Sequence, residues 1–343
     1  MDAAAEHGVG GGAGFIVGPT GAGKTALAIA LAERIGAEIV NADSRQIYRG
    51  MDVGTAKPSA AERARVPHHL FDLRAPDVPI DAAEFARIAR AAVAEIAARG
   101  RPALIVGGSG LYLRALRGGL FAGPPAAPEL RARLAAEIAT AGAPGLHRRL
   151  AAIDAESAAR IAPNDAARIV RALEVHALTG RPLSALQRAH RFAGYAHCGP
   201  CLGVTLERPR LYERIERRFD AMIADGLIAE VQALVAAGME RRGAIPATIG
   251  YREIAAYLRG ETTIEEAVAR AKRASRHLAK RQMTWFRREP DVVWLDPAGG
   301  IEQALELFTN YFKAERARSD GASGAYGGSE RGRDRTAAGG DRG

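Results

Sequence analysis

The stretch GPTGAGKT at Gly18–Thr25 constrains the fold of this chain more than any other feature of its sequence. It matches the phosphate-binding pattern G-x-x-x-x-G-K-[ST], and it stands between the apolar run Phe15–Val17 and the helical spacing of Thr25–Ile35. This strand–loop–helix context predicts backbone N–H groups around a phosphate, with Lys24 on the terminal oxygens and the Thr25 hydroxyl on Mg²⁺. The sequence therefore predicts a bound diphosphate or triphosphate.

Strand and helix signals alternate up to residue 115, which predicts a parallel sheet with helices packed outside it. After a Gly- and Pro-rich linker, segments with helical spacing follow one another until strand character returns at 202–206. Long helices are then expected around Arg210–Ala237 and Ile264–Arg288, and a last helix at Gly300–Ala314. We therefore predict an α/β fold, with a P-loop NTPase-like parallel-sheet core and an inserted all-helical domain. The predicted parts are a flexible N-terminus at 1–13, the core at 14–120 and 200–312, the helical insertion at 121–199 and a disordered tail at 313–343.

The basic charge of the chain indicates a polyanionic partner. Its 48 Lys and Arg residues exceed its 39 Asp and Glu residues, which gives a formal net charge of +9 at pH 7. Nucleic acid is the first candidate for such an excess, and a high-GC genome that favours Arg is the alternative. No apolar run approaches the roughly 20 residues of a membrane span, and the N-terminus does not resemble a signal peptide. With only two cysteines, we expect a cytoplasmic protein without membrane contact, and a monomer is the default expectation.

The strand that an ATPase would use to hold Mg²⁺ and position a water carries no carboxylate here. The candidate strand PALIVGGSG, at 102–110, ends in glycines and Ser109, which is a poor setting for hydrolysis of a γ-phosphate. The second strand ends at Asp43, at the edge where open parallel sheets place their ligand groups. Asp43 is a candidate metal ligand or general base, and Gln46 is a candidate reader of a base edge. A helix-capping turn is the alternative for this stretch.

Eight blocks of the chain together resemble the tRNA dimethylallyltransferases, which prenylate an adenine beside the anticodon. The blocks are GPTGAGKT, NADSRQIYRGMDVGTAKP, PHHLFDL, VGGSGLYLRAL, NDAARIVRALEV, YERIERRFDAMI, IGYREI and LAKRQMTWFRR. They run in order from Gly18 to about Leu295, and Asp43–Pro58 is the most specific of them, because ordinary P-loop kinases lack it.

The resemblance implies that the loop holds the diphosphate of dimethylallyl diphosphate, so no water has to be activated. The dimethylallyl group would pass to the exocyclic amine of the adenine 3′ of the tRNA anticodon, with release of diphosphate. Lys24, backbone amides, Mg²⁺ at Thr25 and an arginine such as Arg281 would meet the charge on the leaving group. Asp43 would take a proton from the amine, and Ser109 would hold the amine or a phosphate oxygen. The implied diphosphate-binding residues are Gly18, Pro19, Thr20, Gly21, Ala22, Gly23, Lys24 and Thr25.

The helix expected at 264–288 indicates RNA binding, because its basic residues recur at three-, four- and seven-residue spacing and share one face. A solvated surface is the alternative. The basic residues of this face are Arg273, Arg276, Lys280 and Arg287. The resemblance also implies that the helical insertion clamps the anticodon stem. The implied tRNA-binding residues are Asp43, Ser44, Arg45, Gln46, Ser109, Arg131, Ala167, Arg168, Ile169, Val170, Arg171, Pro246, Ala247, Thr248, Ile249, Gly250, Tyr251, Lys280, Arg281, Gln282, Met283, Thr284, Trp285, Phe286 and Arg287.

Three features depart from the usual pattern of this family. Ser109 stands where Thr is common, which keeps the hydroxyl, and Arg45 stands where an uncharged residue is usual. Ala166 and Ala167 stand where Pro and Gln are common, so the Gln that would contact RNA there is missing.

Two other activities remain open on the sequence alone. An adenylate isopentenyltransferase would use the same chemistry on a free nucleotide, and a small-molecule P-loop kinase would use Asp43 as a base. The helical insertion and the stretch Lys280–Arg287 favour RNA, and an intact phosphate loop disfavours a non-catalytic RNA-binding protein. Cys198 and Cys201 resemble a redox pair, but a strand follows them where that chemistry needs a helix, so a variable loop is expected.

Overall fold

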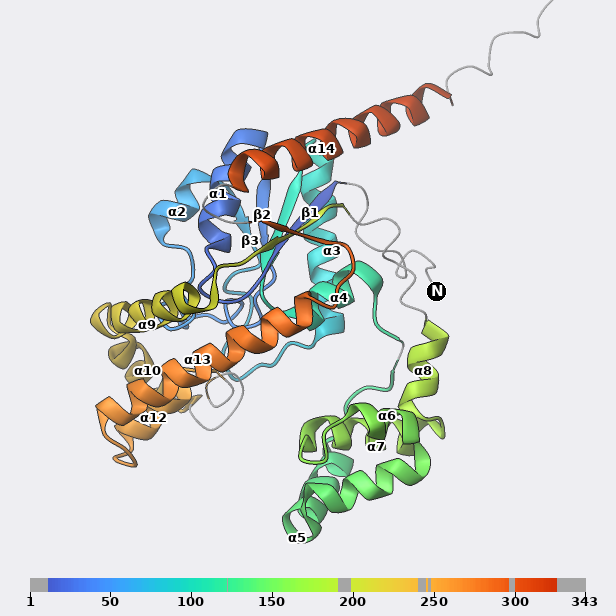
Figure 1. Ribbon diagram of the computed structural model, residues 1–343, viewed down its shortest axis with the longest axis vertical. Coiled ribbons are helices and arrows are strands. Elements are labelled where there is room, and N and C mark those ends of the chain that lie inside the picture. Colours follow the sequence, from blue (N-terminus) through green and yellow to red (C-terminus); the bar gives the residue numbers. More distant parts are fainter. Residues whose placement is uncertain are drawn as a thin grey trace, which may run out of the picture. The chain divides into compact units, whose positions relative to one another are not determined.

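The computed structural model describes residues 12–121, 123–190, 199–239, 245, 248–295 and 300–325. The chain divides into two compact units (Figure 1). The α/β unit contains residues 12–81, 88–110 and the described residues from 199 onwards, and the helical unit contains 82–87 and 111–190. Cys198 of the cysteine pair lies outside the described residues, whereas Cys201 is buried.

Six parallel strands form the sheet of the α/β unit, in the order β3-β2-β4-β1-β5-β6. This confirms the predicted P-loop-like parallel-sheet fold, although the two-residue strand β3 has no signal in the sequence. The four central strands are buried along their whole length, as expected for a sheet covered on both faces. The strands are β1 Ala13–Val17, β2 Glu38–Asn41, β3 His68–His69, β4 Ala103–Gly107, β5 Cys201–Val204 and β6 Val292–Leu295.

The helices of the α/β unit cover this sheet and carry the remaining site residues (Figure 1). None of the helices among the described residues is both long enough and apolar enough to cross a membrane. Helix α3, Ala82–Ala98, contributes residues to both units. The others are α1 Lys24–Ile35, α2 Ala60–Arg65, α9 Arg208–Ala224, α10 Leu227–Ala236, α12 Tyr251–Leu258, α13 Ile264–Phe286 and α14 Gly300–Ala325.

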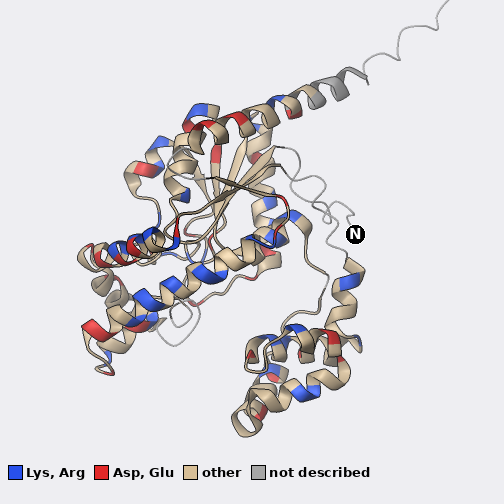
Figure 2. Cartoon of the chain, in the orientation of Figure 1, with Lys and Arg blue, Asp and Glu red and all other residues tan. Residues whose placement is uncertain are grey.

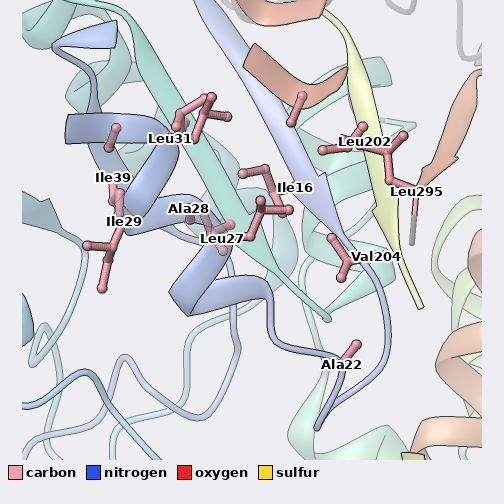
Figure 3. Packing of buried hydrophobic residues seen from close by; sticks show 14 of the residues in the cluster. Ile16, Ala22, Leu27, Ala28, Ile29, Leu31, Ile39, Leu202, Val204 and Leu295 are labelled. Carbon is pink, nitrogen blue, oxygen red and sulfur yellow. The ribbon is translucent and has the colours of Figure 1, made fainter. Parts of the chain in front are cut away.

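The hydrophobic core next to the phosphate loop contains residues of α1, α14 and the central strands (Figure 3). Leu27 and Leu31 of α1 recur one helical turn apart and pack in the same cluster as Ile16 of β1. Phe308 of α14 approaches β1 so closely that a Cβ atom at Gly14 would lie 2.1 Å from its ring. The start of α1, and with it the phosphate loop, is therefore fixed by close packing against the sheet.

Two predicted boundaries differ from the structure. The expected helix Arg210–Ala237 is two helices, because Gly226 adopts φ 100° between α9 and α10, a left-handed conformation that ends a helix. Helix α14 continues to Ala325, so the residue 313 at which we expected a disordered tail to begin lies inside a helix.

The helical unit is held together by its own hydrophobic core and a buried carboxylate. Glu174 of α7 is fully buried, and its carboxylate accepts hydrogen bonds from Arg131, from Arg171 and from the backbone N–H of Ala127. Burial alone would raise the pKa of the Glu174 carboxyl, but these donors outweigh it and lower the pKa to about 2. The helices are α4 Gly110–Gly118, which begins in the α/β unit, α5 Pro128–Ile153, α6 Ala155–Arg160, α7 Ala166–Thr179 and α8 Leu183–His190.

We expect Glu174→Gln to destabilise the helical unit by up to about 3 kcal/mol at pH 7, because a drop of about 2.5 in the pKa corresponds to that free energy. The depressed pKa contributes stability above the unfolded value of 4.5, and this stability is lost as the pH falls towards about 2. Hydrogen exchange of α5 and α7 measures the effect. Glu137→Gln, which removes an exposed pair with Arg149, should change the exchange by less than about 0.5 kcal/mol; equal effects would contradict the role of Glu174.

Candidate active site

The phosphate loop adopts the geometry that its glycines allow. Gly18 has φ 142°, and a Cβ atom there would lie 2.2 Å from the carbonyl oxygen of Val204. Gly23 has φ 101° and is the N-cap of α1, so the backbone N–H groups at the start of this helix lie next to the loop. Lys24 Nζ donates to the carbonyl oxygen of Pro19 at 2.9 Å, which holds the side chain back along its own loop.

A pocket joins the loop to the ends of β2 and β4. Its cationic groups are Lys24 and Arg218, and Asp43 supplies a carboxylate. The wall also contains apolar side chains, which suits a ligand with a charged end and a hydrocarbon end. The lining residues are Thr20, Lys24, Thr25, Ala28, Ile39, Asn41, Asp43, Gln46, Thr55, Pro58, His68, Phe71, Val106, Gly107 and Arg218.

The two cations of the pocket are held in an environment that disfavours their charge. Burial lowers the pKa of Lys24 to about 8, although the nearby Asp43 carboxylate partly opposes the shift. Burial also lowers the pKa of Arg218, with Asp43 again acting in the opposite direction and Arg214 in the same one. A bound polyanion would restore favourable partners to both cations, so the pocket is suited to a diphosphate.

Asp43 and Ser109 meet at the ends of neighbouring strands, as predicted from the sequence. The Asn41 side chain accepts from the backbone N–H of Asp43 at 2.9 Å, and Asp43 Oδ1 accepts from the N–H of Arg45 at 2.8 Å. The Ser109 hydroxyl oxygen accepts from the N–H of Ser44 at 2.9 Å. The first two bonds fix the backbone and the carboxylate direction of Asp43. The third connects the turn after β4 to Ser44, the residue that follows Asp43.

The donor set around Thr25 fits Mg²⁺. The Thr25 hydroxyl and the Asp43 carboxylate line the same pocket, and Mg²⁺ is commonly held by one or two carboxylate or hydroxyl oxygens together with phosphate oxygens. Among the described residues, no cluster of three or more Asp, Glu, His or Cys side chains could hold a metal ion without such a ligand.

Two titratable side chains of this pocket, Arg218 and His68, were not among the site residues predicted from the sequence. Arg218 lies in the block YERIERRFDAMI, but that block contains several arginines and does not reveal which one points inward. His68 Nδ1 donates to the carbonyl oxygen of Val66 at 2.7 Å, and its buried Nε2 has no hydrogen-bond partner among the described residues. Burial lowers the pKa of His68, so a neutral ring is favoured in the free protein.

Several side chains that we assigned to tRNA are used by the fold instead. Gln46 Nε2 donates to the carbonyls of Thr55 and Ala56, both at 3.0 Å, so its donor is not free to read a base. Tyr251 is fully buried and donates to Glu230 at 2.5 Å. The side chains of Ile169, Thr248 and Phe286 are buried as well.

Some of the charged residues assigned to RNA also form ion pairs within the protein, and others are exposed. Arg131 and Arg171 bind the buried Glu174, and Arg276 pairs with Glu216 of α9, so the predicted basic face of α13 loses Arg276. The exposed residues of the predicted tRNA set are Arg131, Ala167, Arg168, Lys280, Arg281, Thr284 and Arg287, and Ser44, Arg45, Val170, Ile249, Met283 and Trp285 are half-buried. Gly250 is buried, and Pro246 and Ala247 lie outside the described residues.

Basic residues recur along α13 in Figure 2, and the exposed ones share one face of the helix. Its residues recur at three- and four-residue spacing, whereas the buried Ala271, Ala279 and Phe286 occupy other faces of the helix. We call this surface the basic stripe; it comprises Arg273, His277, Lys280, Arg281, Thr284, Arg287 and Arg288.

The comparisons with known proteins agree with one another. The family model "IPP transferase" matches residues 46–289. The tRNA dimethylallyltransferase of Geobacter metallireducens is 51% identical over 298 residues, which cover 87% of this chain and 96% of that protein. The tRNA dimethylallyltransferase of Anaeromyxobacter dehalogenans is 53% identical over 285 residues, which cover 82% of this chain and 94% of that protein.

Solved structures show the same likeness. The full-length tRNA isopentenylpyrophosphate transferase of Bacillus halodurans is 38% identical. The match has a TM-score of 0.65 and covers 90% of this chain and 99% of that one. A eukaryotic dimethylallyltransferase acting on tRNA shares the fold at 24% identity, with a TM-score of 0.67 over 83% of this chain and 73% of that one.

Proposed function

The chain belongs to the IPP transferase family, and from this premise we propose that it transfers a dimethylallyl group from dimethylallyl diphosphate to an adenine of tRNA. The acceptor is the exocyclic amine of the adenine 3′ of the anticodon, and diphosphate is the leaving group. The observation that carries the proposal is one pocket that combines the cations Lys24 and Arg218 with the carboxylate of Asp43. The end of β4 supports it, because Gly107, Gly108 and Ser109 offer no carboxylate to activate a water.

The reaction follows from the chemistry of these groups. The amine nitrogen forms a bond to the allylic carbon, and the carbon–oxygen bond to the diphosphate breaks with its electron pair on the diphosphate. Lys24, Arg218 and the N–H groups at the start of α1 stabilise the charge that develops there. Asp43 takes the proton that the amine loses, and Ser109 orients Ser44 beside it.

Mg²⁺ belongs to the proposal as a partner of the diphosphate. Thr25 would hold the ion together with phosphate oxygens, and its charge would further neutralise the leaving group. A monomer that acts in the cytoplasm completes the proposal.

Transfer of a labelled dimethylallyl group tests this function directly. The protein is incubated with Mg²⁺, labelled dimethylallyl diphosphate and total tRNA, and parallel tubes contain AMP instead of tRNA or ATP instead of the prenyl donor. We expect label in tRNA, none in AMP and no release of phosphate from ATP. Label in AMP alone would identify an adenylate isopentenyltransferase, and ATP consumption without prenyl transfer would identify a kinase or ATPase.

We expect Lys280→Ala to weaken tRNA binding and to reduce the salt dependence of the affinity by about one unit of slope, because one phosphate contact of the basic stripe is lost. Binding titrations at several salt concentrations measure the slope. Arg276→Ala is the matched control on the same helix, since Arg276 pairs with Glu216 and should leave the slope unchanged. If Arg276→Ala reduces the salt slope and Lys280→Ala does not, the RNA-binding surface is on the side of α13 that faces α9.

A further inference from the structure

We propose that Gln282 is a positioning residue that fixes the tip of the phosphate loop against the turn after β4, from the side of α13 opposite the basic stripe. The inference rests on the proposed function, because it concerns how the sites for donor and acceptor are held together. It also replaces our expectation that Gln282 contacts tRNA.

The side-chain amide of Gln282 joins two loops that are far apart in the sequence. Its Oε1 accepts from the backbone N–H of Thr20 at 2.8 Å, and its Nε2 donates to the carbonyl oxygen of Gly108 at 3.0 Å. Thr20 belongs to the phosphate loop after β1, and Gly108 follows β4, the strand that pairs with β1. Both polar ends of the amide are therefore used within the protein.

The turn after β4 is shaped to receive this face of α13. A Cβ atom at Gly108 would lie 2.4 Å from Gln282 Nε2, and one at Gly110 would lie 2.4 Å from Trp285 Nε1. Both glycines therefore allow α13 to approach the backbone at distances that any side chain would prevent. This close approach gives a physical reason for the glycines of GGSG that is separate from binding of a ligand.

The orientation of α13 separates Gln282 from the RNA surface. Ala279 and Phe286, three residues before and four after Gln282, lie on the same side of the helix and are buried. Lys280 and Arg281 are close neighbours in sequence, but they point outward in the basic stripe. One face of α13 thus presents cations to solvent, and the opposite face contacts the phosphate loop and the turn after β4 through Gln282.

The bonds of Gln282 reach both halves of the reaction. Through Thr20 it holds the loop that carries Lys24, and through Gly108 it holds the turn whose next residue, Ser109, is bonded to the N–H of Ser44 beside Asp43. A misplacement of about 1 Å between reacting groups can cost about 10²-fold in rate. Loss of Gln282 should therefore slow the transfer step without weakening tRNA binding.

Gln282→Ala and Lys280→Ala form a matched pair on one helix. We expect Gln282→Ala to lower the single-turnover rate at saturating substrates by about 10- to 100-fold, with the tRNA Kd and its salt slope within about twofold of wild type. Lys280→Ala should weaken tRNA binding and reduce its salt slope, with the single-turnover rate at saturating substrates kept. A weaker tRNA affinity together with an unchanged single-turnover rate in Gln282→Ala would overturn the proposal in favour of direct RNA contact.

A double-mutant cycle with Gly108→Ala tests the contact itself. The added methyl group would displace the Gln282 amide, so Gly108→Ala should slow transfer as Gln282→Ala does, and the double variant should be no slower than the slower single variant. Effects that multiply would show that the two residues act independently and would overturn the proposal. Thermal unfolding of each variant separates loss of fold from loss of positioning.

Inorganic diphosphate separates this inference from the proposed function. If wild-type protein transfers no prenyl group to tRNA, the proposed function fails, but calorimetric titration with diphosphate still reports on the loop. We then expect Gln282→Ala to weaken diphosphate binding by at least about threefold and Lys280→Ala to leave it unchanged. Equal affinities for all three proteins would contradict a role of Gln282 in shaping the phosphate loop.

Discussion

Asp43→Asn is expected to lower the rate of prenyl transfer by about 10³-fold while diphosphate binding is kept or becomes tighter. General-base catalysis contributes about 10²- to 10⁴-fold in enzymes, and an amide cannot take the proton that the amine loses. The amide oxygen introduced by this substitution can still accept from the N–H of Arg45, as Asp43 Oδ1 does, so the turn should keep its shape. Replacement of the carboxylate by an amide also removes a negative charge from the pocket that we propose binds diphosphate.

Single-turnover transfer to tRNA and calorimetric titration with diphosphate measure the two effects separately. Asp220→Asn provides a control, because Asp220 is an exposed carboxylate on α9 that pairs with Lys272 outside the pocket. We expect this variant to stay within about twofold of wild type. If Asp43→Asn instead binds diphosphate much more weakly in the presence of Mg²⁺, Asp43 acts through the metal ion and its assignment as a base is wrong.

Local patterns were sufficient to predict the residues at the ends of strands. The phosphate loop, Asp43 and Ser109 each follow a buried apolar run, and parallel strands bring their carboxyl ends to one edge. The structure places Asp43 in the pocket with Lys24 and bonds Ser109 to the residue after Asp43. Prediction succeeded here because strand direction alone determines where these side chains meet.

The direction of side chains on helices was predicted less well. Helix α9 contains five arginines between 208 and 218, and the sequence does not say which of them faces the pocket. On α13, Gln282 was assigned to RNA because the family resemblance implied tRNA contact for the whole stretch Lys280–Arg287, although its side chain faces the phosphate loop. Tertiary contacts, rather than local spacing, decide which face of a helix turns inward.

Irregular segments carry the least information in the sequence. The segment between β2 and α2 is held by its own Gln46, whose side-chain amide donates to the carbonyls of Thr55 and Ala56. It is also held by Glu230 of α10, whose carboxylate accepts from the N–H groups of Val53 and other residues of the segment. These bonds connect residues up to 178 positions apart, and no periodic pattern in the sequence predicts them. The wall of the pocket formed by Thr55 and Pro58 therefore required the structure.

Lys24→Ala is expected to lower kcat/KM for the prenyl donor by about 10³-fold. Removal of a single preorganised group that stabilises developing charge costs about 10²- to 10³-fold in other enzymes, and Lys24 also attracts the ground-state diphosphate. Affinity for tRNA should stay within about twofold, because the basic stripe is untouched. Steady-state kinetics with each substrate varied in turn measure both quantities, and equal losses for donor and tRNA would indicate a general failure of the fold.

The depressed pKa of Lys24 adds a pH dependence with a defined sign. Lys24 is charged below about pH 8 in the free protein and loses its proton above it, whereas a bound diphosphate favours the charged form. The kcat/KM for the donor should therefore fall by up to about tenfold for each pH unit above 8. Lys24→Arg keeps its charge at these pH values, so its kcat/KM, although reduced by the larger side chain, should not fall between about pH 8 and 10. A parallel decline in both proteins would assign the pH dependence to another group.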